Sequence, residues 1–159
     1  MRKSIAVTRR TVLVAAGATT IGGLALYGCG PSGGTPIQVY KDAGCGCCKV
    51  WVRKLQVAGY ATTAEDRDDL QGLKKQLGVP HDLASCHTAT VDRYVIEGHV
   101  PPADIKRLLA EKPSGLGLAV PGMPIGSPGM EVEGEAPEAY TVWLFQKSGE
   151  RTPFAQHDG

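Results

Sequence analysis

A mixed α/β fold, in which helices flank a single sheet, is the class that this sequence predicts for its main domain, residues 36–159. Three features favour it. Short apolar segments typical of strands occur at both ends of the domain, segments with helical spacing separate them, and Gly and Pro mark most of the boundaries. A long Gly/Pro-rich loop before the last expected strand completes the pattern.

The first half of the domain alternates strands and helices. Residues 37–40 alternate apolar and polar side chains, which predicts a first strand. A helix is expected over 49–58, where apolar residues recur at helical spacing and Gly59 follows as a stop signal. Residues 60–64 suit a second strand. A second helix is expected over 70–77, because two acidic residues precede it and a Gly-Val-Pro segment ends it.

The second half adds a hairpin, a helix and a last strand. Strands at 88–91 and 94–97 flank a two-residue turn, and two prolines open a helix at 101–111. Residues 113–137 are rich in Gly and Pro without periodicity, which indicates a functional or strapping loop. Residues 140–145 form a strong last strand. The order β–α–β–α–β–β–α is that of the thioredoxin fold.

The N-terminal residues 1–28 resemble an export signal and are excluded from the fold. Arg9-Arg10 precedes a short apolar run, a pattern similar to a twin-arginine signal. Leu26-Tyr27-Gly28-Cys29 resembles a lipobox, which makes Cys29 the expected lipidation site, and residues 29–35 are expected to be a flexible tether. A plain signal peptide and an uncleaved anchor are the alternatives. All three place the domain outside the cytoplasm, in the periplasm or the cell envelope.

The charge of the domain argues against nucleic-acid binding. The chain has 17 Lys and Arg residues against 16 Asp and Glu, and removal of the export signal leaves 13 basic residues and a net charge of −3. No basic patch or interleaving of aromatic and basic residues remains. We therefore expect no nucleic-acid partner, and contact with a membrane only through the lipid anchor.

Three cysteines within four residues, Cys45-Gly46-Cys47-Cys48, are the most informative feature of the domain. They follow the first strand and precede a helix, where unpaired backbone N–H groups and the helix dipole favour the thiolate, the form that binds metals and acts as a nucleophile. With Cys86 as the fourth thiol, two structural disulfides are the alternative in an oxidising compartment. That alternative is weaker, because three thiols share one loop and a Cys45–Cys48 bridge closes a very small ring.

The stock of soft donors points to copper. Thiolate and thioether ligands select Cu(I), whereas mixtures of thiolate and imidazole also suit zinc. Cys86 lies just before the hairpin, which in a thioredoxin-like topology faces the loop after the first strand, at the place where thioredoxins carry a cis-proline. Cys45, Cys47, Cys48 and Cys86 are therefore the expected metal ligands, for Cu(I) first and zinc second.

Two methionines and one histidine are further candidate ligands. Met123 and Met130 lie in a segment too rich in Gly and Pro for a helix or central strand, so they have little core to fill, although packing remains their alternative role. His99 is expected near the start of a helix, where it binds metal, caps the helix or packs.

The other three histidines are not expected to bind metal. His87 follows Cys86 directly, but on a strand its side chain is expected to point to the opposite face. His81 and His157 are expected to be exposed to solvent.

Four segments together resemble the CopG-like family of periplasmic copper-binding proteins, long catalogued as a domain of unknown function. They occur in order within residues 37–145 and comprise the cysteine motif at 45–48 and the segments 85–89, 94–101 and 117–124. The resemblance implies a thioredoxin-like fold, Cu(I) bound through the cysteines, and a role in copper resistance with copper or thiol redox activity. The four domain cysteines match the family's cysteine positions, and Met123, Met130 and His99 fall within the matched span.

Two functions remain open on this basis. The first is a binding protein that captures Cu(I) for copper resistance, or that passes copper to a periplasmic exporter, chaperone or cuproenzyme. The second is a thiol–disulfide oxidoreductase, because Cys45 and Cys48 have C-x-x-C spacing at a helix N-terminus, so that Cys45 would attack and Cys48 resolve. Cys47 between them invites wrong pairings and counts against the second. A disulfide-stapled adaptor domain is a third option.

Overall fold

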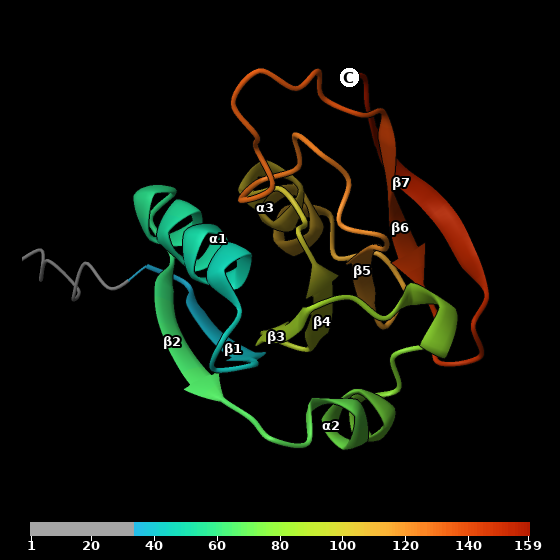
Figure 1. Ribbon diagram of the computed structural model, residues 1–159. Coiled ribbons are helices and arrows are strands. Elements are labelled where there is room, and N and C mark those ends of the chain that lie inside the picture. Colours follow the sequence, from blue (N-terminus) through green and yellow to red (C-terminus); the bar gives the residue numbers. More distant parts are fainter. Residues whose placement is uncertain (1–33) are drawn as a thin grey trace, which may run out of the picture. The chain divides into compact units, whose positions relative to one another are not determined.

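The computed structural model describes residues 34–159, which form a seven-stranded mixed sheet flanked by helices (Figure 1). The α/β fold class predicted from the sequence is confirmed. The elements in chain order are β1 (Pro36–Lys41), α1 (Gly46–Val57), β2 (Ala61–Asp66), α2 (Leu70–Leu77), the short 3-10 helix η1 (His81–Leu83), β3 (His87–Val91), β4 (Tyr94–Gly98), α3 (Pro102–Glu111), β5 (Gly117–Val120), β6 (Tyr140–Phe145) and β7 (Arg151–His157).

The strands lie in the order β2-β1-β3-β4-β5-β6-β7 across the sheet. β1 pairs with β2 in parallel and with β3 antiparallel, and β3 and β4 form the predicted hairpin. β5 then pairs with β4 in parallel, and β6 and β7 continue antiparallel. The thioredoxin-like order of elements is therefore present from β1 to α3, and three further strands extend the sheet beyond β4.

Apolar side chains cover both faces of the sheet. Trp51 and Leu55 of α1 pack with Ile105 of α3 on one face, and all three are fully buried. Leu83 of η1 packs with Phe145 of β6 on the other face. Figure 1 shows the same division, with α1 and α3 on one side of the sheet and α2 and η1 on the other. Burial of a large apolar side chain contributes about 1.5–3 kcal/mol, so these contacts fix each helix on its face.

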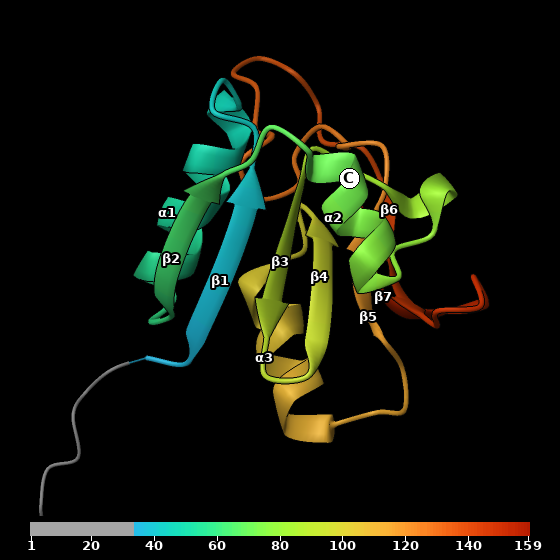
Figure 2. The same cartoon turned by 90° about the horizontal axis from the view of Figure 1, so that it is seen from below.

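The register of β1 and β3 determines where the cysteines meet. Lys41, the last residue of β1, lies opposite His87, the first residue of β3. Figure 2 shows that β1 ends and β3 begins at the same end of the sheet. The loop that follows β1 contains Cys45, and the residue that precedes β3 is Cys86. The pairing of two strands therefore brings together cysteines that are far apart in the sequence.

One helix boundary and two strands differ from the sequence predictions. The first helix begins at Gly46 rather than at residue 49, because Cys45 serves as its N-cap and draws the other cysteines into the first turn. The stretch 113–137 is not all loop, since Gly117–Val120 forms β5, a fully buried strand whose continuous apolar run shows no alternation. β7 was not expected, and its many polar side chains suit its position at the edge of the sheet.

The predictions for the N-terminus lie outside the described residues. They concern the export signal at 1–28, the lipidation site Cys29 and most of the tether at 29–35. Within residues 34–159, every helix is too short or too polar to cross a membrane.

Candidate metal centre

The first turn of α1 carries the local cysteines. Cys45 has an extended backbone, with φ −70° and ψ 99°, and its Sγ accepts the Cys48 N–H at 3.3 Å. This N-cap bond satisfies one of the free N–H groups at the helix start. Cys47 and Cys48 follow within the first turn. Sulfur therefore lies at the positive end of the helix dipole, where negative charge is stabilised.

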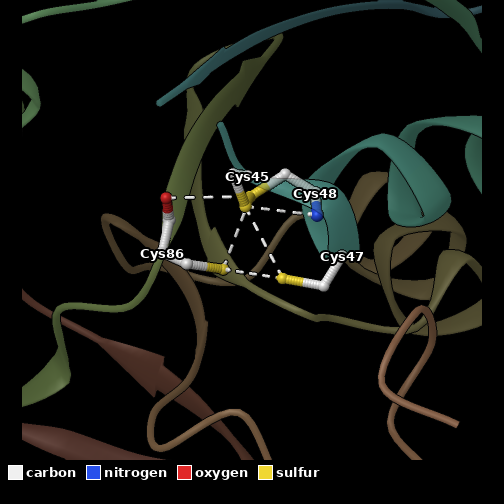
Figure 3. A group of neighbouring side chains, drawn as sticks. All are labelled: Cys45, Cys47, Cys48 and Cys86. Carbon is white, nitrogen blue, oxygen red and sulfur yellow. Dashed lines mark hydrogen bonds between the residues drawn. A yellow bond between two sulfur atoms is a disulfide. The ribbon is translucent and has the colours of Figure 1, made fainter. Parts of the chain in front are cut away.

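Cys86 faces this turn from the start of β3. Its Sγ lies 3.6 Å from Cys48 Sγ and 4.0 Å from Cys47 Sγ, and Cys47 Sγ lies 3.5 Å from Cys45 Sγ. Figure 3 shows the four side chains directed at one another from the two segments. All four sulfur atoms lie within 4.8 Å of one another, close enough to bind one ion together. The structure thus brings the four predicted cysteines together, and their role as ligands remains a prediction.

Cys45 and Cys48 are joined by a disulfide, which leaves Cys47 and Cys86 as free thiols (Figure 3). The Cα atoms of Cys45 and Cys48 are 5.4 Å apart, within the usual range for a disulfide. The bridge spans only one helical turn, so it does not link distant parts of the chain. The disulfide form offers two thiols at this point of the fold, and the reduced form offers four.

His99 adds a nitrogen donor to the sulfur cluster. Its Nε2 lies 3.1 Å from Cys86 Sγ, while Nδ1 lies 2.9 Å from the Pro128 carbonyl oxygen. A carbonyl can only accept, so Nδ1 carries the proton and the lone pair of Nε2 points at the sulfur. A fixed tautomer of this kind is typical of histidines that bind metals.

His87 contradicts the sequence prediction. Its side chain was expected on the face of the strand away from Cys86, but its Nδ1 lies 3.3 Å from Cys86 Sγ. The alternation rule fails because Cys86 precedes β3, so its side chain does not follow the pleat of that strand. His87 is fully buried, with its ring centroid 4.3 Å from that of Trp51 and 4.9 Å from that of His99.

The remaining histidines lie away from the cluster. His81 is exposed in η1, as the sequence predicts. His157 is only half-exposed, because its Nε2 lies 2.7 Å from Asp104 Oδ2 and its ring stacks on Tyr140. The expectation that His157 faces solvent was wrong, since it assumed a free C-terminus where the structure has β7.

Burial shifts the protonation of the donors. Burial lowers the pKa of His99, although the Pro128 carbonyl and Glu131 oppose it. Burial, with the charges of His99 and Lys74, holds the pKa of His87 well below its ordinary value. Both imidazoles are therefore neutral at pH 7, as metal binding requires. Burial and the neighbouring Cys47 raise the pKa of Cys86 to about 12, so a metal that binds this sulfur must displace a proton.

A loop segment covers the cluster, and we call residues 121–130 the strap. Gly129 lies directly against the first turn of α1, where an added Cβ would be 3.0 Å from both Cys47 O and Trp51 N. Its φ of +93° also favours glycine. The prediction of a strapping loop at this place is consistent with these contacts.

The two methionines belong to the strap. Met130 is half-buried, and its N–H donates to Ser127 O while its carbonyl accepts from Gly126 N. Met123 is 39% exposed and has a φ of +50°. Ligation by either methionine stays a prediction.

The donors fall into two overlapping groups. One comprises the four cysteines, and the other comprises Cys86, His87 and His99. Thiolates with neutral imidazoles suit a soft or borderline metal. The sequence pointed to the first group and to His99, but it missed His87. The adjacency of Cys86 and His87 was the signal that could have revealed this residue.

The fold and the donor set define a thioredoxin-like α/β protein with a sulfur-rich candidate metal centre. Two solved structures, titled copper resistance protein CopG form 1 and form 2, are 44% and 42% identical to this chain. They cover 79% and 78% of it and 99% and 98% of their own chains, with TM-scores of 0.74 and 0.73. Residues 83–130 match the family described as a protein of unknown function, DUF411. Comparison with curated proteins gives no match. The chain belongs to the CopG family of copper resistance proteins.

Proposed function

We propose that this protein captures Cu(I) outside the cytoplasm through Cys45, Cys47, Cys48 and Cys86. The convergence of the four sulfur atoms within 4.8 Å carries the proposal. In the reduced state the site offers four thiolates, and soft ligands of this kind select Cu(I).

Zinc is the main competitor for a four-cysteine site. Structural zinc sites are usually built from pairs of cysteines separated by two to four residues. Here three cysteines lie in C-x-C-C spacing, and two of them are adjacent. The titles of the similar structures name copper resistance. Both observations favour Cu(I) over zinc.

The physiological role that we propose is copper resistance or copper transfer. The protein would limit free Cu(I) or pass it to a periplasmic exporter, chaperone or cuproenzyme. The signal-like start of the chain supports export, and Cys29 supports attachment to a membrane by lipid. In this arrangement residues 36–159 form the metal-binding domain, and residues 29–35 form its tether.

A thiol–disulfide oxidoreductase is the second candidate, and the Cys45–Cys48 disulfide favours it. In the reduced protein, Cys45 would attack a substrate disulfide, form a mixed disulfide and release one thiolate. Cys48 would then attack Cys45 Sγ and release the second thiolate, so that two electrons pass to the substrate. Cys45 is half-buried and Cys48 is fully buried, which suits these roles.

Anaerobic titration of the reduced protein tests the proposal. Cu(I) is added against a chromophoric chelator, and Zn(II) is titrated in parallel, for wild type and Cys86→Ser. We expect tight Cu(I) binding by wild type and a loss of at least about tenfold in Cys86→Ser, because one of four ligands is removed. Ser114→Ala is the control, since Ser114 is exposed and lies outside both donor groups.

Two outcomes contradict the proposal. The first is equal Cu(I) affinity in wild type and Cys86→Ser. The second is preference for Zn(II). Reduction of insulin disulfides without metal affinity would support the oxidoreductase instead.

A further inference from the structure

A buried ion pair lies beside Cys86, and neither the fold prediction nor the proposed copper site accounts for it. Lys74 Nζ of α2 lies 2.6 Å from Glu97 Oε1 of β4, and their side chains are 3% and 0% exposed. Two buried charges lose their hydration, and a pair of apolar residues is often equally stable in such a place. The pair therefore calls for a reason other than fold stability.

The hydrogen bonds of Glu97 flank Cys86 on both sides. Oε1 accepts the Ser85 backbone N–H at 2.6 Å, and Oε2 accepts the Thr88 hydroxyl at 2.6 Å. Lys74 Nζ also donates to Thr88 Oγ1 at 2.7 Å. One carboxylate thus fixes the residue before Cys86 and the second residue after it.

The next two residues of the chain contact the same segment. Gly98 has a φ of +73°, and an added Cβ would lie 2.7 Å from Ser85 Oγ. His99 Nε2 lies 3.1 Å from Cys86 Sγ. Three consecutive residues therefore contact the segment 85–88. Glu97 does so through its carboxylate, Gly98 through a close backbone approach and His99 through its imidazole.

We propose that Glu97, neutralised by Lys74, is a positioning residue that holds Cys86 Sγ within reach of Cys47 and Cys48. The inference rests on the proposed function, because it concerns the geometry of the same copper site. Glu97 lies on the face of the sheet that carries α2, whereas His87 packs against Trp51 of α1 on the other face. Glu97 therefore acts through the Ser85 N–H and the Thr88 hydroxyl rather than as a ligand.

The test compares two double variants of the full-length protein. Lys74→Met/Glu97→Met removes the charges and every acceptor for the Ser85 N–H. Lys74→Met/Glu97→Gln removes the charges but keeps an amide oxygen for that bond. Arg107→Gln/Glu111→Gln, which removes an exposed ion pair on α3, is the control. Cu(I) affinity by chelator competition, thiolate-to-Cu(I) absorption per bound copper, and hydrogen exchange of the Ser85 amide are measured for each.

We expect the Met/Met variant to bind Cu(I) about 10–100-fold more weakly, as is typical when partners of metal ligands are lost. Its thiolate-to-Cu(I) absorption should fall and its Ser85 amide should exchange faster. The Met/Gln variant should retain most of the affinity, because the bond to Ser85 N–H is kept. The control should match wild type.

Affinity and absorption equal to wild type in the Met/Met variant would overturn the positioning role, as would an equal loss in both double variants. If the Met/Met variant does not fold, Thr88→Val removes one of the two flanking bonds in an almost isosteric change. A loss of several-fold is then expected, and unchanged Cu(I) affinity would overturn the role. Failure of wild type to bind Cu(I) would instead refute the proposed function. The Ser85 exchange rates test the positioning bond without copper.

Discussion

Cys86 is the residue on which the candidate site depends, because its sulfur contacts donors from three separate segments. Cys48 Sγ lies 3.6 Å away, His99 Nε2 3.1 Å and His87 Nδ1 3.3 Å. Each neighbour comes from a different element or its edge, so the arrangement exists only in the folded protein. Removing Cys86 should therefore affect both donor groups at once.

The buried imidazole of His87 should make the folded protein less stable in acid. Burial is the main cause that holds its pKa well below the ordinary value of 6.5. In the pH range below 6.5 the unfolded chain binds a proton at this position and the folded protein does not, so the free energy of unfolding falls as pH decreases. In the metal-free, reduced protein, His87→Phe should therefore lose less unfolding free energy than wild type between pH 7 and pH 5. Urea titrations at several pH values measure it, and parallel curves for the two proteins would contradict it.

Most residues of the candidate site could be predicted from the sequence, and those that could not, His87, Glu97 and Lys74, were missed for physical reasons. Four cysteines stood out because their type and spacing are rare outside thiolate chemistry. His87 was assigned to the wrong side because strand alternation was extended to a residue that lies before the strand. Glu97 and Lys74 carried no signal, since their pairing depends on how α2 packs against the sheet.

At the scale of elements, the strap and the start of α1 form one unit. Gly129 of the strap lies against the Cys47 carbonyl, and Pro128 O fixes the tautomer of His99. Just beyond the strap, Glu131 forms an ion pair at 2.7 Å with Lys54 in the last turn of α1. The ion pair is exposed on both sides and contributes at most about 1 kcal/mol. Backbone fit, rather than charge, must therefore hold the strap in place.

Gly129→Ala tests this account of the strap. An added Cβ would press on Cys47 O and Trp51 N while φ stays at +93°, so we expect the free energy of unfolding to fall by about 2–3 kcal/mol. Gly134→Ala is the matched control, because its φ of +84° is similar but nothing lies within 4 Å of an added Cβ. Denaturant unfolding compares the two variants, and equal losses would show that the strap does not press on α1.

Element boundaries show where sequence patterns fail. The helix start was placed at residue 49, where the apolar spacing begins, yet Cys45 Sγ caps a helix that begins at Gly46. β5 lies in a Gly-rich segment and was missed. Gly117 is required in this strand, because any Cβ there would overlap the Val95 carbonyl of β4. In both cases a contact with a distant or unusual partner decided the structure, and local propensity did not reveal it.

At the scale of the whole molecule, the end of the sheet at which β1 ends and β3 begins carries the candidate site. The order of the first elements was predictable because each has a clear period and a clear stop signal. Of the last three strands, β6 was predicted with the bounds that the structure shows, whereas β5 and β7 were not expected. β7 is polar and contains Pro153, a residue that an edge strand tolerates. The four cysteines are positioned by β1, α1 and β3, and all three elements were predicted.

The location of the protein gives a prediction of its own. If Cys29 is lipidated, the mature protein should fractionate with membranes and should incorporate a labelled fatty acid. Cys29→Ala should remove both properties while leaving Cu(I) binding unchanged, because the candidate site lies in residues 45–99. Replacement of Arg9 and Arg10 by lysine should block export. Membrane association that survives Cys29→Ala would point to an uncleaved anchor.

The central claim is that the cysteines at the start of α1 and Cys86 before β3 bind the same Cu(I) through their sulfur atoms. X-ray absorption at the copper edge of the Cu(I)-loaded protein, prepared anaerobically in the reduced state, tests it most directly. A first shell dominated by sulfur is expected, with a smaller sulfur contribution in Cys86→Ser. A shell dominated by nitrogen or oxygen, or a sulfur shell that Cys86→Ser leaves unchanged, would contradict it.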